Sequence, residues 1–202
     1  MTPKLLLVTR NLAKVKEYSL LFQDAPFHLT TLAEEGINME VDEIGHTLEE
    51  NAQLKATAYA SNRFLVMADD SGLEVDALGG EPGSLSARYA GKDASDKERI
   101  ALLLSRLDGV PWERRSARFR CIIAIASVSR IVGLCEGECQ GIITFEPRGD
   151  HGFGYDPIFY LPELGKTMAE LSLEEKNRLS HRGKAAREAL KVLEPMWRGF
   201  SQ

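Results

Sequence analysis

Four hydrophobic residues, 65–68, run directly into two adjacent carboxylates, Asp69 and Asp70. The hydrophobic run is typical of a strand buried in a sheet, and the Ser71 and Gly72 that follow indicate a turn. Two carboxylates at the end of a buried strand are unfavourable unless a cation or basic side chains offset their charge. The pattern therefore predicts a buried strand that ends at a charged site. A turn with an aspartate cap is the alternative that the same residues allow.

A magnesium ion is one cation able to offset these carboxylates. Proteins hold Mg²⁺ with one or two carboxylates, and the ion keeps several of its waters. One or both aspartates, together with a glutamate from elsewhere in the chain, would therefore suffice. Four glutamates precede the strand and are candidates for that role: Glu40, Glu43, Glu49 and Glu50.

Strand and helix patterns follow one another along the chain, which predicts a mixed α/β (α+β) fold with a central sheet. Strands are expected at 4–8, 27–31, 65–68, 119–125, 131–134 and 142–145. Helices are expected after 14, from capping boxes that begin at Thr47, Ser95 and Ser172, and at the C-terminal end. The segment 146–162 is expected to be a structured loop. No repeat or linker interrupts the chain, so residues 1–202 are expected to form a single domain.

The composition argues against two classes of partner. The chain has 202 residues and a formal net charge of -5, so neither a nucleic acid nor an anionic membrane is expected to bind. The apolar run 5–8 is too short for a signal peptide or a membrane-spanning helix, and the three cysteines lack a metal-binding spacing. We therefore expect a cytoplasmic protein with free thiols, whose substrate is a small molecule.

The turn between the first expected strand and helix, 9–14, is a candidate phosphate site. Backbone N–H groups at the start of a helix are unpaired and attract anions. Lys14 would add a positive charge, and Asn11 is able to hydrogen-bond a phosphate or sugar oxygen. Because the segment lacks a glycine-rich phosphate-loop pattern, an ordinary surface turn is the alternative.

A second candidate region, 147–157, combines glycines, aromatic residues, carboxylates and basic groups. Gly152 and Gly154 leave Phe153 sterically free to reach a ligand. An aromatic face stacked on a nucleobase contributes roughly 1–3 kcal/mol. The region therefore indicates a base-binding loop, with a structural aromatic hairpin as the alternative.

A third region, 174–182, places cationic and donor groups between two helical stretches. These groups are Lys176, His181 and Arg182. A lone lysine or arginine on a helix is normally solvated, so this segment alone indicates little. The aspartates and these three regions together supply a phosphate cradle, metal-binding carboxylates, a stacking surface and donors for a base edge. Those are the parts of a nucleoside triphosphatase.

The same segments resemble the inosine/xanthosine triphosphate pyrophosphatase family. The resemblance runs from about residue 4 to about residue 193, in long motifs that follow the family's order. The matching stretches are 46–56, 68–83, 86–91, 152–159 and 176–182.

The resemblance implies two lobes around a long mixed β-sheet, with the nucleotide in the cleft between them, and a homodimer. It also implies Mg²⁺-dependent hydrolysis of ITP, dITP and XTP to the monophosphate and pyrophosphate, which cleanses the nucleotide pool. By position, Asp70 would be the catalytic carboxylate, and Glu43 and Asp70 would hold the metal. Lys14 and Lys176 would act electrostatically on the polyphosphate. The residues expected to bind substrate are Thr9, Arg10, Asn11, Lys14, Ser71, Phe153, Gly154, Tyr155, Asp156, Lys176, His181 and Arg182.

One motif departs from the family pattern. Arg10 and Ala13 stand where the family has glycines, in Ser/Thr-Gly-Asn-x-Gly-Lys, whereas Asn11 and Lys14 are retained. Close approach of the backbone to phosphates is therefore in question at residue 10, where Arg10 would instead add a charge contact. Two alternative functions remain open at this point. One is a septum-inhibition type of nucleotide pyrophosphatase with a different base specificity, and the other is a nucleotide-binding module without catalysis.

Overall fold

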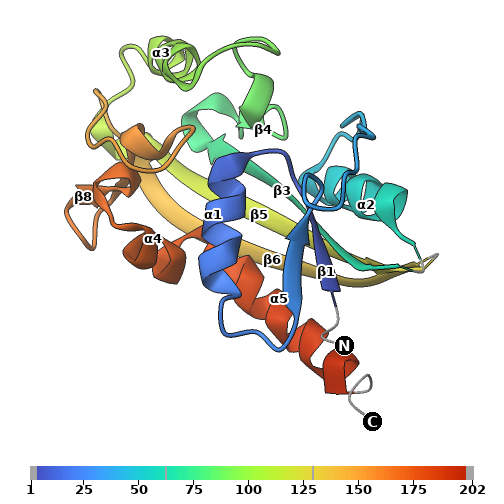
Figure 1. Cartoon of the computed structure of the whole chain (residues 1–202). Helices are drawn as coiled ribbons and strands as arrows, with labels where there is room; N and C mark the ends of the chain where they lie inside the picture. The colour runs from blue at the N-terminus through green and yellow to red at the C-terminus, as the bar shows by residue number, and fades with distance from the viewer. Residues whose placement is uncertain (1–3, 62, 129, 199–202) are drawn as a thin grey trace.

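The computed structural model of the chain describes residues 4–61, 63–128 and 130–198 (Figure 1). β1 (Lys4–Val8) lies between β2 (His28–Thr31) and β3 (Leu65–Val75), and the three are parallel. The sheet continues antiparallel from β3 through β5 (Ser116–Ser127), β6 (Arg130–Ile143), β7 (Phe159–Leu161) and β8 (Lys166–Thr167). β4 (Pro82–Gly83) also pairs with β3. Within the described ranges these eight strands form one mixed sheet, as the sequence predicts.

Three of the helices in the described ranges begin directly after the capping boxes that the sequence predicts, and the first helix begins at Leu12, within the segment expected to be a turn. The helices are α1 (Leu12–Leu21), α2 (Leu48–Tyr59), α3 (Asp96–Arg106), α4 (Leu173–Leu179) and α5 (His181–Arg198). The capping boxes at Thr47, Ser95 and Ser172 are all formed, each with a glutamate three residues later. In each box two side chains accept hydrogen bonds from two backbone N–H groups that would otherwise lack an acceptor. These bonds fix the first residue of the helix. None of the helices in the described ranges is long and apolar enough to cross a membrane.

The two faces of the sheet carry separate hydrophobic cores. α1 and α5 cover one face (Figure 1), where Leu5 and Leu7 pack with Tyr18 and Ala189. α2 covers the other face, where Leu6 and neighbouring residues pack with its buried alanines. This division follows from the alternation of side chains along a strand. A third core lies around α3 and β7, at the far ends of β3, β5 and β6.

Three expectations about strands are wrong. β3 does not end at residue 68 but continues to Val75, because β5 pairs with it along the whole of this length. The segments 131–134 and 142–145 belong largely to one strand, β6, whose polar and glycine-rich middle hides the strand pattern. The segment 146–162 is not entirely loop, because Phe159–Leu161 adds β7 to the sheet.

Candidate functional site

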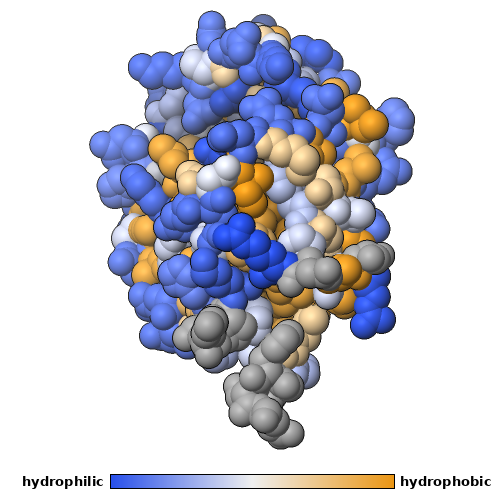
Figure 2. All heavy atoms as spheres, turned by 45° about the vertical axis from the view of Figure 1, so that its right-hand side comes forward, coloured by the Kyte–Doolittle hydropathy of each residue, from blue (hydrophilic) through white to orange (hydrophobic). Residues whose placement is uncertain are grey.

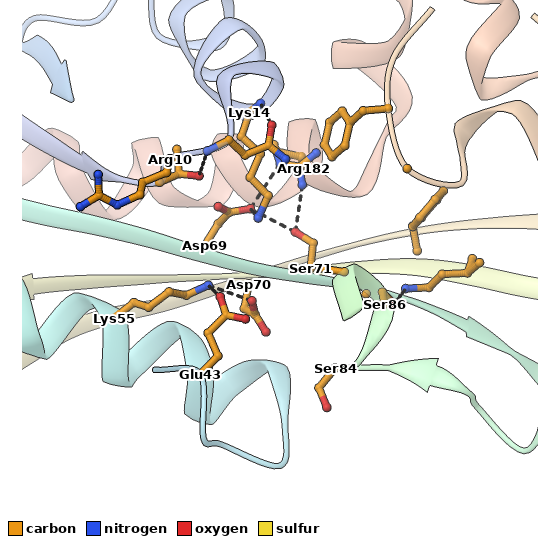
Figure 3. Close-up of a pocket in the computed structure, with 18 of the residues that line it drawn as sticks. Arg10, Lys14, Glu43, Lys55, Asp69, Asp70, Ser71, Ser84, Ser86 and Arg182 are labelled. Atoms are coloured by element: carbon orange, nitrogen blue, oxygen red, sulfur yellow. Dashed lines mark hydrogen bonds and ion pairs between the residues drawn. The ribbon is translucent and has the colours of Figure 1, made fainter. Parts of the chain in front are cut away.

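A cleft of about 560 Å³ lies where the N-terminus of α1, the middle of β3 and the start of α5 meet. Every residue that the family resemblance assigns to the site lines this cleft, from Thr9 to Arg182. Of the four candidate glutamates, Glu40 and Glu43 line it, whereas Glu50 closes the capping box of α2 and Glu49 pairs with Arg120. The close-up in Figure 3 shows that β3 runs through the middle of it, with charged side chains on both sides of the strand. On the face shown in Figure 2, hydrophilic residues predominate and apolar residues lie in smaller groups among them.

Asp69 and Asp70 point to opposite faces of β3 (Figure 3). Successive side chains alternate along a strand, and both residues lie in its interior rather than at its end. The expectation that the two carboxylates meet at a strand end is therefore wrong. Each one has its own set of basic partners, so the cleft contains two electrostatic environments separated by the strand.

Asp69 belongs to the environment on the α1 and α5 side. Lys14 Nζ lies 2.9 Å from its carboxylate and Arg182 Nε lies 3.3 Å from it. Ser71, on the same face, donates to Asp69 at 3.1 Å and accepts from Arg182 at 3.0 Å. Burial raises the pKa of Asp69, but Lys14 and Arg182 oppose it and hold the pKa well below its usual range. Asp69 is therefore an anion that fixes the positions of two cations.

Asp70 belongs to the environment on the α2 side. Lys55 Nζ lies 2.8 Å from Asp70 and 2.9 Å from Glu43, so one ammonium joins the two carboxylates. Asn51 donates to the other oxygen of Asp70 at 3.3 Å, and its own side-chain oxygen accepts from the backbone of Gly45 at 2.8 Å. Burial raises the pKa of Asp70, and Lys55 only partly offsets this effect. Of the two aspartates, Asp70 is thus the better proton acceptor.

Asn51 and Lys55 were not among the site residues predicted from the sequence. They are four residues apart on α2, so they lie on one face of the helix. That face also carries Ala52 and Ala56, which pack against the sheet. A polar residue and a lysine on the packing side of a capped helix are the signal that could have identified them.

The carboxylate oxygens of Glu43 and Asp70 suit a divalent cation whose remaining ligands come from the substrate and from water. Glu43 and Asp70 already reach one ammonium group, so their carboxylates face a common point. In the part of the chain that the structure describes, no group of three or more His, Cys, Asp or Glu side chains forms a metal cage. Two carboxylates completed by phosphate oxygens and water are the arrangement that Mg²⁺ favours. The residues present therefore fit this ion.

Phe153 marks the aromatic part of the cleft. Gly152 and Gly154 on either side have φ of 74° and 63°, a backbone conformation that favours glycine. Lys176 Nζ lies 4.8 Å from the centre of the Phe153 ring, and the Arg182 guanidinium lies 5.4 Å from it. Both cations form ion pairs with Glu17, a buried residue of α1 that was not predicted from the sequence. Lys176 Nζ lies 2.7 Å from one carboxylate oxygen of Glu17, and a terminal nitrogen of Arg182 lies 2.7 Å from the other. Lys176 also pairs with Asp156, so its charge is balanced inside the protein.

His181, the first residue of α5, is buried beside these groups. Its ring stacks on Phe119, with 4.7 Å between centroids and an angle of 15°. Burial and the nearby cations Arg182 and Lys176 lower the pKa of His181 well below its ordinary value, so the ring is neutral. Among the described residues, its Nδ1 atom has no hydrogen-bond partner. A buried polar atom without a partner is unfavourable, so this atom is available to a ligand.

Asn11 holds the turn 9–14, which the sequence predicts as a phosphate site and which is called the phosphate turn below. Its side-chain oxygen accepts from the backbone N–H groups of Ala13 at 2.9 Å and Lys14 at 3.2 Å, and so caps α1. That oxygen is therefore engaged by the protein itself. Arg10 extends away from the turn, where it donates to the carbonyl of Met39 at 3.1 Å and lies 3.8 Å from Glu40.

A helix start with a lysine, a pair of carboxylates and an aromatic loop with a neutral histidine open into one cleft. This combination defines a class of protein that binds a nucleotide through its phosphates and its base. Residues 5–192 match the sequence profile of the Ham1 family, and the chain belongs to this family.

Two kinds of relative agree with this assignment. The dITP/XTP pyrophosphatase of Geobacillus kaustophilus is 51% identical over 96% of this chain and 94% of its own length. The enzyme of the same name from Bacillus subtilis is 47% identical over 94% of this chain and 96% of its own length. Among solved structures, a HAM1 protein from Coxiella burnetii matches with a TM-score of 0.86 and 39% identity, covering 96% of this chain and 100% of that one. The Ham1 protein of Staphylococcus aureus matches with a TM-score of 0.84 and 41% identity, covering 96% and 99%.

Proposed function

We propose that this protein hydrolyses ITP, dITP and XTP to the corresponding monophosphate and pyrophosphate. The observation that carries the proposal is the single cleft in which the start of α1, the pair Glu43 and Asp70, and Phe153 meet. The names of relatives that share about half of the sequence support the choice of substrates. Such an enzyme removes these purine nucleotides from the nucleotide pool.

In the proposed reaction, water attacks the α-phosphorus and pyrophosphate leaves. The N-terminus of α1 and Lys14 attract the polyphosphate, because the helix presents unpaired N–H groups and positive charge there. Asp70 accepts the proton of the attacking water, a role favoured by the raised pKa of its carboxyl. Asn51 holds the second oxygen of Asp70 and so orients the first.

We propose Mg²⁺ as the cofactor, held by Glu43 and Asp70. When bound, the ion would neutralise charge on the phosphates and orient the leaving group. Lys55 takes part in the same arrangement, because its ammonium already holds the two carboxylates together. EDTA is therefore expected to abolish turnover, and added Mg²⁺ to restore it.

Base recognition is assigned to the aromatic part of the cleft. Phe153 stacks on the purine, and Lys176 supports the ring from within the protein instead of acting on the polyphosphate. Each of the three nitrogens of Arg182 already donates to the protein, to Asp69, Glu17 and Ser71, so three of its five N–H groups are engaged. His181, whose Nδ1 is unpaired, is the better candidate, and the neutral tautomer that carries its proton on Nδ1 would donate to O6 of the base. Adenine presents an amino group there, and two facing donors would cost about 1–3 kcal/mol.

A substrate panel tests the proposal. Pyrophosphate release would be measured for ITP, dITP, XTP, GTP, ATP, dTTP and UTP, with and without Mg²⁺. We expect the first three to be hydrolysed with the highest kcat/KM, and only with the metal. Preferential hydrolysis of dTTP or UTP would instead indicate the septum-inhibition type of specificity. Tight binding of ITP without any hydrolysis would indicate a module that has lost catalysis.

The proposal extends to assembly and location. We propose a homodimer, as the family resemblance implies, in the cytoplasm. Light scattering on the purified protein measures the first point: a dimer has twice the chain mass of 22.4 kDa. Cell fractionation measures the second.

A further inference from the structure

Asp96, the first residue of α3, binds the backbone of the loop that carries Phe153. Its Oδ2 atom accepts a hydrogen bond from the backbone N–H of Gly154 at 2.7 Å, across 58 positions of the sequence. Its other oxygen pairs with Arg99, which in turn donates to the carbonyl of Ala87 at 2.9 Å. Asp96 and Arg99 both line the cleft. The carboxylate is therefore fixed at both oxygens, one of which is committed to the loop.

The two amides next to the Phe153 side chain are each bound by a carboxylate. Phe153 N–H donates to Asp156 at 2.9 Å, and the next N–H, that of Gly154, donates to Asp96. Hydrogen bonds to an ionised acceptor are stronger than neutral ones. The loop is also anchored on both sides of Phe153, by the backbone N–H of His151, which donates to Ala169, and by the buried Tyr155, whose hydroxyl donates to Ser86 at 3.0 Å. Between these anchors the glycines at 152 and 154 have wide backbone freedom, so the two bonds to carboxylates restrict the backbone at Phe153 itself.

We propose that Asp96 is a positioning residue for base binding, which acts through the Gly154 amide to hold Phe153 where it stacks on the purine. This inference rests on the proposed function, in which Phe153 stacks on the base. Asp96 does not itself touch the reacting atoms. In this proposal the N-terminus of α3 contributes to the base site, a contribution that the sequence motifs did not indicate.

A simpler role for Asp96 is to stabilise α3, since an acidic side chain in the first turn favours a helix. The chain offers a control that separates the two roles. Glu98 completes the capping box of the same helix by accepting from the backbone of Ser95 at 2.7 Å, and it lies outside the cleft. Glu98→Ala weakens the start of α3 but leaves the bond from Gly154 to Asp96 in place. Asp93→Ala removes an exposed charge from the loop before α3 and controls for net charge.

The test compares kcat and KM for ITP, together with melting temperature, in six variants, one of them a double variant. Asp96→Ala should raise KM about tenfold, the value of one strong hydrogen bond, and change kcat less than about threefold. Asp96→Asn should stay within about threefold of wild type, because the amide oxygen still accepts from Gly154. The amide nitrogen then replaces the oxygen that faces Arg99, which keeps its bonds to the carbonyls of Ala87 and Ala94. Glu98→Ala should lower the melting temperature without raising KM, and Asp93→Ala should change neither. In Phe153→Ala protein, adding Asp96→Ala should have no further effect on KM.

Three results would overturn the inference: an unchanged KM in Asp96→Ala, an equal rise in Glu98→Ala, or a full additional rise in the Phe153→Ala background. Calorimetric binding of IMP, the monophosphate product, measures the same site without turnover. If the wild-type protein fails to hydrolyse ITP, the proposed function fails. Weaker IMP binding by Asp96→Ala, restored in Asp96→Asn, would still support the positioning role, and equal binding by the wild type and Asp96→Ala would refute it.

Discussion

Lys55→Met removes the cation that joins Glu43 and Asp70 while keeping the length of the side chain. The Lys55 side chain is 12% exposed and that of Asp70 is 9% exposed, so water screens this pair little. Burial lowers the pKa of Lys55, but the two carboxylates outweigh burial and raise the pKa above its ordinary value. The ammonium is therefore charged at neutral pH. Its removal leaves two carboxylates facing each other, Asp70 with the Asn51 amide and Glu43 with Arg88 at 3.7 Å, but without the cation that joined them.

The size of the effect follows from this geometry. Deleting one partner of a buried ion pair costs about 3–5 kcal/mol. Glu43 is 32% exposed and can turn towards water, so we expect a loss near the lower limit, about 3 kcal/mol. For a chain of this length each 1 kcal/mol lowers Tm by about 2–4 °C, so the expected drop is about 6–12 °C at pH 7.

The loss should depend on pH in a defined direction. In the wild type Lys55 lowers the pKa of Glu43, so this pair stabilises the fold above the unfolded carboxyl pKa and less as pH falls through the folded one. In the variant both carboxyls lose the effect of Lys55, which lowers their pKa values, so their ionisation as pH rises should disfavour the folded state more than it does in the wild type. The difference in Tm between the two proteins should therefore be small near pH 4 and grow towards pH 7.

Thermal melts with and without Mg²⁺ measure these expectations, and Lys16→Met, an exposed lysine of α1, is the control. Mg²⁺ should raise Tm more in Lys55→Met than in the wild type, because both carboxylates are then free to bind the ion and only the folded state brings them together. Equal Tm values for the two lysine variants at pH 7 would refute the argument about stability. An equal response to Mg²⁺ in Lys55→Met and wild type would refute the assignment of Glu43 and Asp70 to one metal.

Three further substitutions test separate parts of the site. Asp70→Asn should lower kcat for pyrophosphate release by roughly 10²–10⁴-fold, and turnover close to wild type would exclude Asp70 as the base. Its Tm should fall as well, because the buried Lys55 ammonium then keeps Glu43 alone of its two carboxylate partners. Phe153→Ala should raise KM for ITP about tenfold or more, because it removes the stacking surface; unchanged kinetics would exclude stacking there. Gly137→Ala would place a Cβ 2.1 Å from the carbonyl oxygen of His181. It should displace the start of α5, cost about 1–3 kcal/mol of stability and raise KM; a normal melt and KM would show that the helix start tolerates the shift.

The parts of the fold that the sequence predicts well are those specified by local chemistry. Each capping box predicts the first residue of a helix, because its two reciprocal hydrogen bonds are made within four consecutive residues. The motif residues of the site are similar in this respect. Many of them lie at the start of a helix or in glycine-rich turns, whereas Asp70 and Ser71 lie inside β3 and Lys176 lies inside α4. All of them line the cleft. Local signals therefore identified which segments meet.

The parts that the sequence did not reveal depend on pairing across the sheet. Because β5 pairs with β3 on both sides of Asp69 and Asp70, the strand continues through these two residues. In a continuous strand, adjacent side chains point to opposite faces of the sheet. Glu17 is a further residue that the sequence did not reveal, because its place beneath Lys176 and Arg182 depends on the packing of α1 against the start of α5. The contact between Glu17 and Arg182 joins residues more than 150 positions apart, so the residue pattern within a single segment does not predict it.

The substitution of Arg10 and Ala13 for the family's glycines now has a physical account. Ala13 lies inside α1, in a helical conformation that any residue adopts, and the turn is closed by Asn11 instead of by an unusual backbone angle. Glycine at these positions is therefore not required to form the cap. The Arg10 side chain binds the carbonyl of Met39, so it does not cover the N–H groups at the start of α1. Because residue 39 precedes Glu43 by only four positions, this bond ties the phosphate turn to the segment that carries one of the two proposed metal-binding carboxylates.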